Sequence, residues 1–415
     1  MAASNIVNVP LVLKELWLDR IEDFKYEDRP FYAMVDKDTS WSGLKLHVTM
    51  QYANGTSTTS RFDVAKNKKR ASKFAAMEVE TADLFTLWSV DNKLITLTRD
   101  QKGSLVRMLD KATTDAMDKH RRRTAWQLWG NGGGSAGKLS AASGTTLTLS
   151  NANNVRNFDI GDPIEFASDD GRAGAGVLSE TREITAIDPD AGTLTIDATI
   201  AGTALAGVTA NYHVFHEGDY GSDNHVLKGV TSYILLEGPG TGSDPASIWG
   251  MSRTARPEVL AGSRFTPSAN LIVIEAIKEA LVKAYRRSIN VSHLWCSPEI
   301  FNEVEMSLEG QRRYADEKVG KIGFTGLEFS AISGKTVKLF ADPDIPIGPS
   351  SEELVFGLDM NKWTFHTAEE WPMWLTADGG KKFLTEENAN AREGRLGGYG
   401  NLYTTNANQF VLKLG

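Results

Sequence analysis

The sequence predicts an α+β protein built from several units, and three observations support this class. Residues 100–129 have the periodicity of one long helix, residues 41–66 alternate like a pair of long strands, and residues 139–219 are an acidic block of short β-like runs. The chain has 415 residues, of which 41% are hydrophobic, and this suits two or three domains with an adequate core.

Composition excludes some classes of protein. No apolar run approaches the ~20 residues of a membrane-spanning helix, so we expect no membrane partner. The N-terminus has no basic segment before an apolar stretch, so it does not resemble a signal peptide. Cys296 is the only cysteine, which rules out an intrachain disulfide and suits a reducing compartment. A lone cysteine is most often a small buried apolar residue.

The net charge of −8 is concentrated in one block. Residues 139–219 hold 12 acidic and 3 basic residues, whereas the rest of the chain is close to neutral. This imbalance predicts a separate unit that faces away from any polyanion.

Residues 1–40 are predicted to form an N-terminal arm. Pro10 stands near the start of a short amphipathic helix whose apolar stripe includes Leu13, Trp17 and Phe24. Residues 27–38 (EDRPFYAMVDKD) are predicted to be extended or irregular. We expect the arm to pack on the body, and a helix that binds a partner is the alternative.

Residues 41–66 give the clearest β signal. Apolar residues from Leu44 to Tyr52 alternate with polar ones, and Asn54-Gly55 separates them from a second run, Thr56–Val64. Asn-Gly between such runs predicts a tight hairpin turn. The residues assigned to the tip of this hairpin are Tyr52, Asn54, Gly55 and Thr56. A lone two-stranded hairpin is marginal in water, so we expect it to rest on another chain. A hairpin inside a larger sheet is the alternative, and the basic run 66–70 is either a solvated face or a contact with acidic groups.

Residues 71–99 lead into the long helix over residues 100–129. Asp100 suits the N-cap, Leu109 and Ala116 lie on the apolar face, and Gly130 suits the C-terminal stop. The basic run 119–123 lies in the second half, where cations favour the helix dipole. A helix of this length measures roughly 40–45 Å, so it is expected to support other elements.

The glycine-rich link over residues 130–138 matches three enzyme motifs: G-x-G-x-x-G, G-x-S-x-G and G-x-x-x-x-G-K. All three need a helix that begins after the glycines, whereas here the helix comes before them. We therefore interpret the link as a flexible hinge to the next unit. The hinge residues are Gly130, Gly132, Gly133 and Gly134.

Short β-like runs in residues 139–219 predict a small barrel or sandwich. They are Thr145–Leu149, Pro163–Phe166, Val177–Ile187, Thr193–Ile196 and Ala210–Phe215. His213-x-x-His216 resembles a metal motif, but an odd spacing in a strand points the two rings to opposite faces.

Residues 220–370 are predicted to be an independent α/β-type unit. A helix over residues 271–287 precedes a buried strand, Val291–Cys296, and Ser297 caps a second helix that stops near Gly310. Two strands follow at Thr336–Phe340 and Glu353–Leu358. In residues 371–415, Arg392–Gly400 is interpreted as a loop and residues 401–414 as a closing strand.

The search for a reaction centre finds none. Ser42-x-x-Lys45 and Ser222-Asp223-Asn224 resemble parts of a penicillin-binding site, but the first lies in a predicted strand rather than at a helix start. The histidines are scattered, and no Cys/His cluster suits zinc. We therefore predict no enzyme activity, no metal and no cofactor.

The order of these features resembles the major capsid protein of tailed bacteriophages, the Hong Kong 97-type capsid fold. The resemblance rests on the arm, the hairpin, the helix ending in QLWGNGGG, a β insert, HEGDYG, and the later segments HLWCSPEIF, GLEFSAISGKTVKLFADPDIP and ELVFGLDMNKWTFHT. It spans nearly the whole chain apart from the insert.

The resemblance implies a division of the chain into six parts. They are an N-terminal arm (1–40), an extended loop (41–70), a peripheral domain with its spine helix (71–138), an inserted all-β domain (139–219), an axial domain (220–370) and C-terminal strands that return to the peripheral domain (371–415).

The resemblance also implies a virion structural protein that self-assembles into hexamers and pentamers of an icosahedral shell in the bacterial host cytoplasm. The shell would enclose double-stranded DNA and take portal, scaffolding and decoration proteins as partners. Basic residues on an inner face would contact phosphate without sequence readout. The candidates are Lys68, Lys69, Arg70, Arg121, Arg122 and Arg123. Residues 53–60 contain no lysine, so the loop crosslink of some relatives is not expected.

Two alternatives from other classes stay open at this point. One is an encapsulin-like cellular compartment shell, which encloses a cargo enzyme. The other is a soluble hydrolase or carbohydrate-binding protein.

Overall fold

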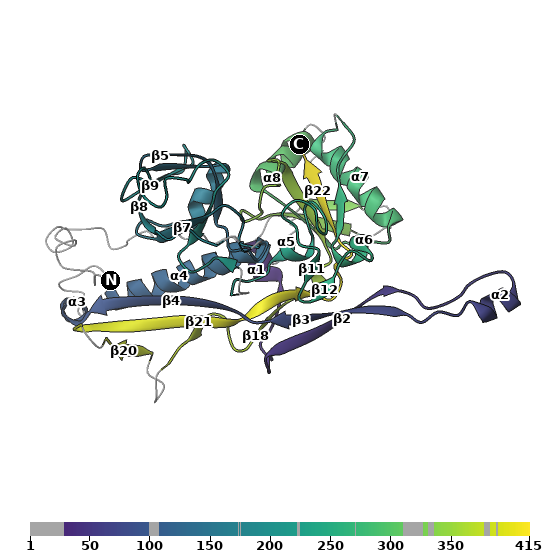
Figure 1. Ribbon diagram of the computed structural model, residues 1–415, viewed down its shortest axis with the longest axis horizontal. Coiled ribbons are helices and arrows are strands. Elements are labelled where there is room, and N and C mark those ends of the chain that lie inside the picture. The colour runs from purple at the N-terminus through teal and green to yellow at the C-terminus, as the bar shows by residue number, and fades with distance from the viewer. Residues whose placement is uncertain are drawn as a thin grey trace.

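The computed structural model describes residues 29–98, 108–172, 174, 176–221, 225–269, 271–309, 327–330, 336–376, 382–386 and 389–415. The predicted helix near residues 10–24, the Asp100 cap and Ser222-Asp223-Asn224 lie outside them. Within this part of the chain the fold is α+β, with two six-stranded sheets, a closed barrel and a long two-stranded ribbon (Figure 1). No helix in these ranges is long and apolar enough to cross a membrane.

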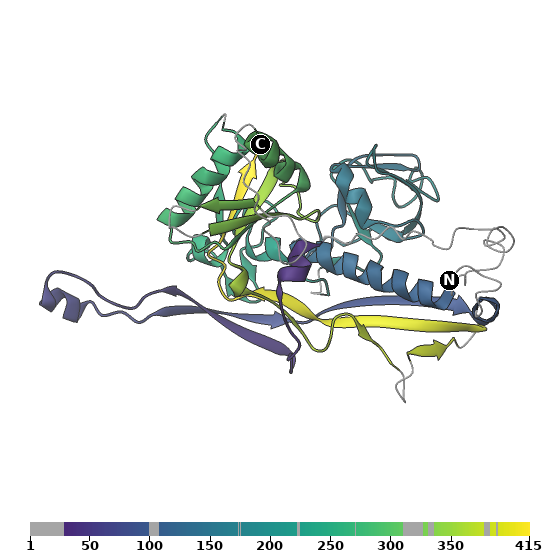
Figure 2. The same cartoon turned by 180° about the vertical axis from the view of Figure 1, so that it is seen from behind.

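An elongated sheet forms the base of the molecule (Figures 1 and 2). Its two longest strands, β4 (Ala82–Asp91) and β21 (Ala391–Thr404), pair antiparallel. Three other strands also pair with β21, and β1 (Asp36–Asp38) joins the edge beside the first of them. These three are β18 (Trp363–Thr367), β19 (Met373–Trp374) and β20 (Phe383–Thr385).

The long helix α4 (Met108–Trp129) lies along this sheet and ends where Gly130 predicts (Figure 1). Ala116 is buried as expected, but the buried face then continues through polar side chains, including His120 and Thr124. Both are partnered: His120 Nδ1 lies 3.1 Å from Thr86 Oγ1, and Thr124 Oγ1 accepts from Trp371 Nε1 at 2.9 Å. A half-polar buried face explains why apolar periodicity marks this helix only weakly.

Trp129 anchors the C-terminal end of α4 in the main core. Its indole is fully buried, with ring centroids 4.5 Å from Phe31 and 5.3 Å from Phe356. Phe31 belongs to α1 (Pro30–Met34) and Phe356 to the second sheet, so one side chain joins three segments. Truncating such a residue typically costs about 3–5 kcal/mol.

The second sheet forms a compact unit with α7 (Val273–Arg286) and α8 (Pro298–Glu309). Its strands, in spatial order, are β13 (Ser263–Phe265), β22 (Phe410–Leu414), β17 (Glu353–Leu358), β14 (His293–Cys296), β16 (Thr336–Ala341) and β15 (Leu327–Ser330). In β14, Leu294 and Cys296 pack with the two helices, whereas Trp295 faces the main core. The predicted Ser297 cap is confirmed, because its Oγ accepts from Ile300 N at 3.3 Å.

The insert is a closed six-stranded barrel, so the predicted choice of a barrel or a sandwich is settled. Its helical element η3 (Ala152–Asn157) lies between the second and third strands. The strands are β5 (Gly137–Ser143), β6 (Thr146–Leu149), β7 (Pro163–Ala167), β8 (Arg182–Asp188), β9 (Thr193–Ile196) and β10 (His213–His216). Closure removes exposed sheet edges, which lets so small a unit bury its own core.

Two predictions about the C-terminal part are wrong. Arg392–Gly400 is not a loop but the middle of β21, and its glycines make room for large side chains on neighbouring segments. A Cβ on Gly394 would lie 2.3 Å from Trp88, and one on Gly398 would lie 2.4 Å from Trp371.

The predicted division into residues 220–370 and 371–415 does not follow the sheets either. β18 belongs to the elongated sheet although it precedes residue 371, whereas β22 belongs to the compact sheet. The chain therefore crosses between the two units more often than the linear division assumed.

Candidate assembly site

A long ribbon projects from the body beneath the compact unit (Figures 1 and 2). It consists of β2 (Lys45–Ala53) and β3 (Lys73–Glu80), which pair antiparallel. On its inner face the base of the ribbon buries Val48, Met50, Met77 and Val79 in the main core. The base is therefore part of the body, and only the distal half projects.

The predicted turn at Asn54-Gly55 is wrong, because the strand that pairs with β2 begins 19 residues after Asn54 rather than two. Gly55 instead lies beside the returning chain: Arg70 N donates to Gly55 O at 3.1 Å, and a Cβ on Gly55 would meet Ser72 N at 2.2 Å. Tyr52 is not at the tip either, since it packs against the main core and its carbonyl accepts from Arg256 at 2.8 Å. Asn54, Gly55 and Thr56 stand part of the way along the projection.

The actual tip carries a short helix, α2 (Phe62–Asn67). Phe62 is 82% exposed and Val64 37% exposed, although both are apolar. Lys68, Lys69 and Arg70 follow, and no carboxylate of the described residues lies within 4.0 Å of their charged groups. We call Phe62, Val64, Lys68, Lys69 and Arg70 the tip surface. Its apolar and cationic side chains are left exposed by the described part of the chain.

The predicted basic run of α4 does not form one free face. Arg122 and Arg123 turn toward the barrel, and their side chains are only 16% and 20% exposed. Three cations of α4 pair with three carboxylates of the insert: Lys119 with Asp159 and Asp162, Arg122 with Asp159, and Arg123 with Asp219. We call these six residues the clamp. Part of the acidity of the insert thus faces the helix, and Arg121 alone of the three arginines is left exposed.

Removing one cation of the clamp should destabilise the fold. Arg122→Gln is expected to lower the free energy of unfolding by about 1.5–3 kcal/mol, because it breaks a charged hydrogen bond at a half-buried site. Arg121→Gln is the matched control and should stay within about 0.5 kcal/mol of the parent chain. Urea unfolding of the three proteins measures this difference, and equal effects at both positions would contradict the assignment.

The glycines between α4 and the barrel are packed rather than free. Gly132, Gly133 and Gly134 are buried, and Gly133 O accepts from Gly221 N at 2.9 Å. A Cβ on Gly133 would lie 1.9 Å from Asp170 O, so only glycine allows the two backbones to cross this closely. Three of the residues predicted as a flexible hinge, Gly132, Gly133 and Gly134, therefore stand at a close-packed junction, whereas Gly130 is only partly buried.

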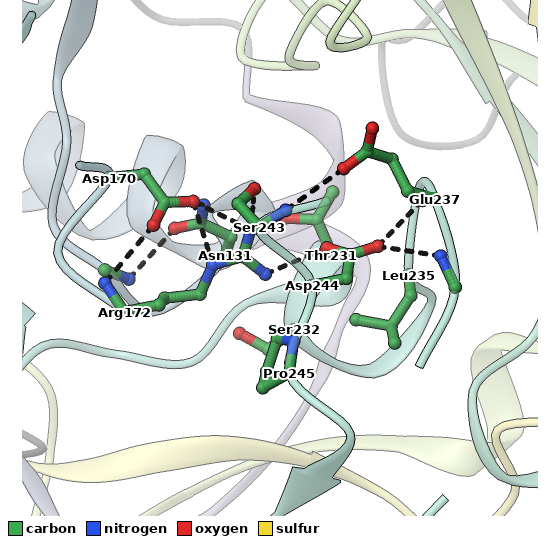
Figure 3. Close-up of polar contacts among 12 residues, drawn as sticks. Asn131, Asp170, Arg172, Thr231, Ser232, Leu235, Glu237, Ser243, Asp244 and Pro245 are labelled. Carbon is green, nitrogen blue, oxygen red and sulfur yellow. Dashed lines mark hydrogen bonds and ion pairs between the residues drawn. The ribbon is translucent and has the colours of Figure 1, made fainter. Parts of the chain in front are cut away.

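An ion-pair network that the sequence analysis missed joins the insert to the body (Figure 3). Arg172 of the barrel donates to Asp170 at 2.9 Å and to Asp244 at 3.0 Å. Asp244 also accepts from Glu237 N at 2.7 Å, and Asn131 donates to Asp170 at 2.9 Å. The partners come from three separate parts of the chain, at residues 131, 170–172 and 237–244, so no local pattern marks them.

Burial shifts the pKa of many titratable groups, among them His120, His216 and Asp342. It lowers the pKa of His120 to about 4 and that of His216 to about 3, with Arg123 as the next cause at both. In the folded chain these histidines bind fewer protons than in the unfolded chain, so stability is lost as pH falls from 6.5 toward the folded values. Burial raises the pKa of Asp342 to about 6, and this shift has the opposite effect on stability. The stabilisation from protonated Asp342 is lost as pH rises from 3.8 through 6.

His120 and His216 should dominate the pH dependence of the free energy of unfolding between pH 7 and pH 5. We expect each to lower the free energy of unfolding by roughly 2 kcal/mol over this interval, partly offset by Asp342. His120→Gln should reduce the pH dependence of the free energy of unfolding. Urea unfolding at the two pH values is the measurement. A chain that becomes more stable toward pH 5 would refute the assignment.

The motifs considered for chemistry have structural partners. His213 Nδ1 lies 2.9 Å from Ser135 Oγ, and His216 Nε2 lies 3.0 Å from Asn157 O. Ser135 also donates to Gly137 O, so its hydroxyl is engaged at the point where the barrel closes. Among the described residues, no group of three or more His, Cys, Asp or Glu side chains is placed to hold a metal.

We compared this architecture with known proteins. No family model and no curated protein matches the chain. The capsid asymmetric unit of Cyanophage A-1(L) matches with a TM-score of 0.54 at 10% identity, over 99% of this chain and 98% of that one. The capsid of a native GTA particle matches at 9% identity and a TM-score of 0.49 over the full length of both chains. The SrpI encapsulin of Synechococcus elongatus PCC 7942 matches at 8% identity and 0.44, over 100% of this chain and 96% of that one.

The match to the cyanophage capsid identifies the class of fold. The chain has the Hong Kong 97-type fold, the fold of the major capsid proteins of tailed phages, over nearly its full length. Capsid proteins of this fold are structural proteins rather than enzymes.

Proposed function

We propose that this chain is the major capsid protein of a tailed bacteriophage. Its subunits would form hexamers and pentamers of an icosahedral shell that encloses double-stranded DNA, assembled in the cytoplasm of a bacterial host. The fold supports the role of a shell subunit, and the projecting ribbon is the observation that supports assembly most directly.

The ribbon supports assembly because its distal half packs against no other described segment of the same subunit. Two strands projecting into water are marginally stable on their own, and this ribbon exposes Phe62 at its far end. An exposed apolar side chain beside uncompensated lysines fits an apolar surface with an acidic rim on another copy of the chain. The ribbon is therefore proposed to lie across a neighbouring subunit.

Contact with DNA is proposed for Arg121, whose charge is exposed. For Lys68, Lys69 and Arg70, contact with DNA is the alternative to the acidic rim of a neighbouring subunit. The commitment of Arg122 and Arg123 to the clamp argues against them as phosphate ligands. Portal, scaffolding and decoration proteins are proposed as further partners. The exposed side of the barrel offers a surface for a decoration protein.

Electron microscopy of the purified chain tests the proposal. Closed particles with hexamers and pentamers are expected, and a chain that stays monomeric at high concentration would overturn the shell function. The contents of particles purified from the natural source then separate the two shell classes: packaged double-stranded DNA supports a phage capsid, whereas a protein cargo would identify an encapsulin-like compartment.

A further inference from the structure

A groove of about 580 Å³ lies where β2 of the ribbon meets the compact unit. Its walls come from the end of β2, from α6 (Pro257–Leu260) and the residue before it, and from the C-terminal end of α7. The remaining walls come from η5 (Met360–Lys362) and from the loop between β21 and β22. The volume lies within the range of small-molecule sites, about 300–1,000 Å³. Segments that are far apart in the sequence therefore meet around one groove.

The lining of this groove is positively charged. It contains Arg256, Arg287 and Lys362, and no Asp or Glu among the described residues. Glu258 lies 3.1 Å from Arg256 and compensates its charge, whereas it interacts with Arg287 only at longer range. Within the described ranges, no carboxylate lies within 4.0 Å of Arg287 or Lys362. The groove therefore keeps an excess of positive charge.

Arg287 and Lys362 are both exposed, so their charged groups can be reached from solvent. Arg287 Nη1 donates to Ser263 Oγ at 3.2 Å, and its guanidinium lies 5.0 Å from the centre of the Phe265 ring. Both partners are neutral, so they hold the guanidinium at the wall of the groove without compensating its charge. Its Nε and Nη2 make no hydrogen bond to a described residue, so these donors remain for a ligand.

Lys362 extends from η5, and its ammonium makes no hydrogen bond or ion pair with a described residue. The carboxylate nearest to it in sequence is that of Asp359, which is buried and accepts from Asn290 Nδ2 at 2.7 Å. This carboxylate is therefore stabilised by an amide rather than by the lysine. An exposed ammonium and an exposed guanidinium in one groove, neither with a carboxylate partner, favour a ligand that has more than one negative oxygen.

Neutral donors also line the groove. They are the hydroxyls of Ser288 and Thr405 and the side-chain amide of Asn408, and none of them hydrogen-bonds to a described residue. A phosphate group can accept from several such donors at once, because it presents three or more acceptor oxygens. An acidic peptide would also need apolar anchors, and the apolar lining is limited to Val259 and to Met50, which is 4% exposed. The lining therefore favours phosphate over the carboxylates of a peptide.

We propose that this groove binds a phosphate group, carried either by a small phosphate compound or by the backbone of a nucleic acid. Arg287 and Lys362 would donate to its oxygens, and the Ser288 hydroxyl would add a neutral hydrogen bond. Contacts of this kind recognise the phosphate and carry no information about base sequence. The site belongs to a single subunit, so it does not depend on the proposed shell function.

Calorimetric titration of the full-length chain with inorganic phosphate at constant ionic strength tests the site. We expect saturable binding, with no saturable signal for chloride. Fluorescence anisotropy with a short labelled DNA duplex then distinguishes the two sources. A duplex that binds and is displaced by phosphate identifies a nucleic-acid backbone, whereas phosphate binding without duplex binding identifies a small phosphate compound. Polyglutamate that binds the groove more tightly than phosphate would overturn the assignment to phosphate.

Lys362→Gln should weaken phosphate binding about fivefold or more, because a charged hydrogen bond to the ligand is lost. The lysine side chain has no partner among the described residues, so this variant should fold like the parent chain. Arg287→Gln should weaken phosphate binding as well. Thermal melting of both variants checks that they fold.

Lys278→Gln is the matched control. Lys278 is exposed on α7 and has no carboxylate within 4.0 Å among the described residues, but it does not line the groove. The change removes the same charge as Lys362→Gln, and this variant should bind phosphate with the affinity of the parent chain. The absence of saturable binding, unchanged affinity in the folded Lys362 variant, or an equal loss in the Lys278 variant would overturn the proposal.

Discussion

A chain in which residues 54–72 are replaced by a short turn is expected to fold into a stable subunit that forms no shells. The replacement keeps β2 and β3 paired, so Val48, Met50, Met77 and Val79 stay buried in the main core. It removes only the projecting part, which contributes little to the subunit itself. Losing about 3 kcal/mol of contact per subunit would lower the association constant by more than about 100-fold.

Circular dichroism and thermal melting of the shortened chain check its fold, and electron microscopy checks its assembly. A single-residue test is sharper. Phe62→Ser should reduce assembly, whereas Ile160→Ser, which alters an equally apolar side chain 68% exposed on the barrel, should not. Normal particles from the shortened chain would contradict the proposed role of the ribbon.

Gly134→Ala is expected to be among the most destabilising single changes in the chain. Gly134 has φ +85°, and a Cβ there would lie 1.8 Å from the backbone oxygen of Asp219. Neither backbone can move without opening the crossing between α4 and the barrel, where Asp219 also pairs with Arg123. We expect a loss of about 4 kcal/mol or more.

Gly218→Ala separates the steric effect from backbone strain. Gly218 has φ +83°, but an added Cβ would meet nothing within 4 Å. It should therefore cost only about 1–2 kcal/mol, the strain of the left-handed conformation. Urea unfolding and limited proteolysis within residues 130–138 measure both effects. Similar losses for the two variants would show that the junction is not close-packed.

The sequence predicted the elements whose signal is local. The C-terminal end of α4, five of the six strands of the barrel and the Ser297 cap follow from caps, turns and periodicity within short windows, whereas the first strand, β5, was not predicted. The barrel could be predicted because its hydrophobic runs and Gly, Asp and Asn turns recur at short intervals.

The partner of β2 could not be predicted in this way. Asn54-Gly55 is a strong turn signal, but a strand at Thr56–Val64 would offer the body only Phe62 and Val64. β3 offers Met77 and Val79, which are buried with Val48 and Met50. Burial against the body therefore decided the register over local turn chemistry.

The clamp and the glycine junction could not be predicted from the sequence either. Arg123 and Asp219 are 96 residues apart, and their contact depends on how the barrel folds back over α4. A basic run and an acidic block have the same sequence whether the basic run binds a polyanion that the acidic block avoids, or the two pair with each other. A run of glycines likewise indicates either two backbones that pass close together or a flexible segment. Only the position of the opposing backbone distinguishes the two.

The position of β22 has a consequence for the order of events during synthesis. This strand lies between β13 and β17 in the compact sheet, yet residues 410–414 are translated after every other strand of that sheet. Until they leave the ribosome, β13 has no neighbour and the sheet stays divided. A nascent chain therefore cannot complete its compact unit before residues 410–414 have emerged, which delays any contact between subunits that needs this unit.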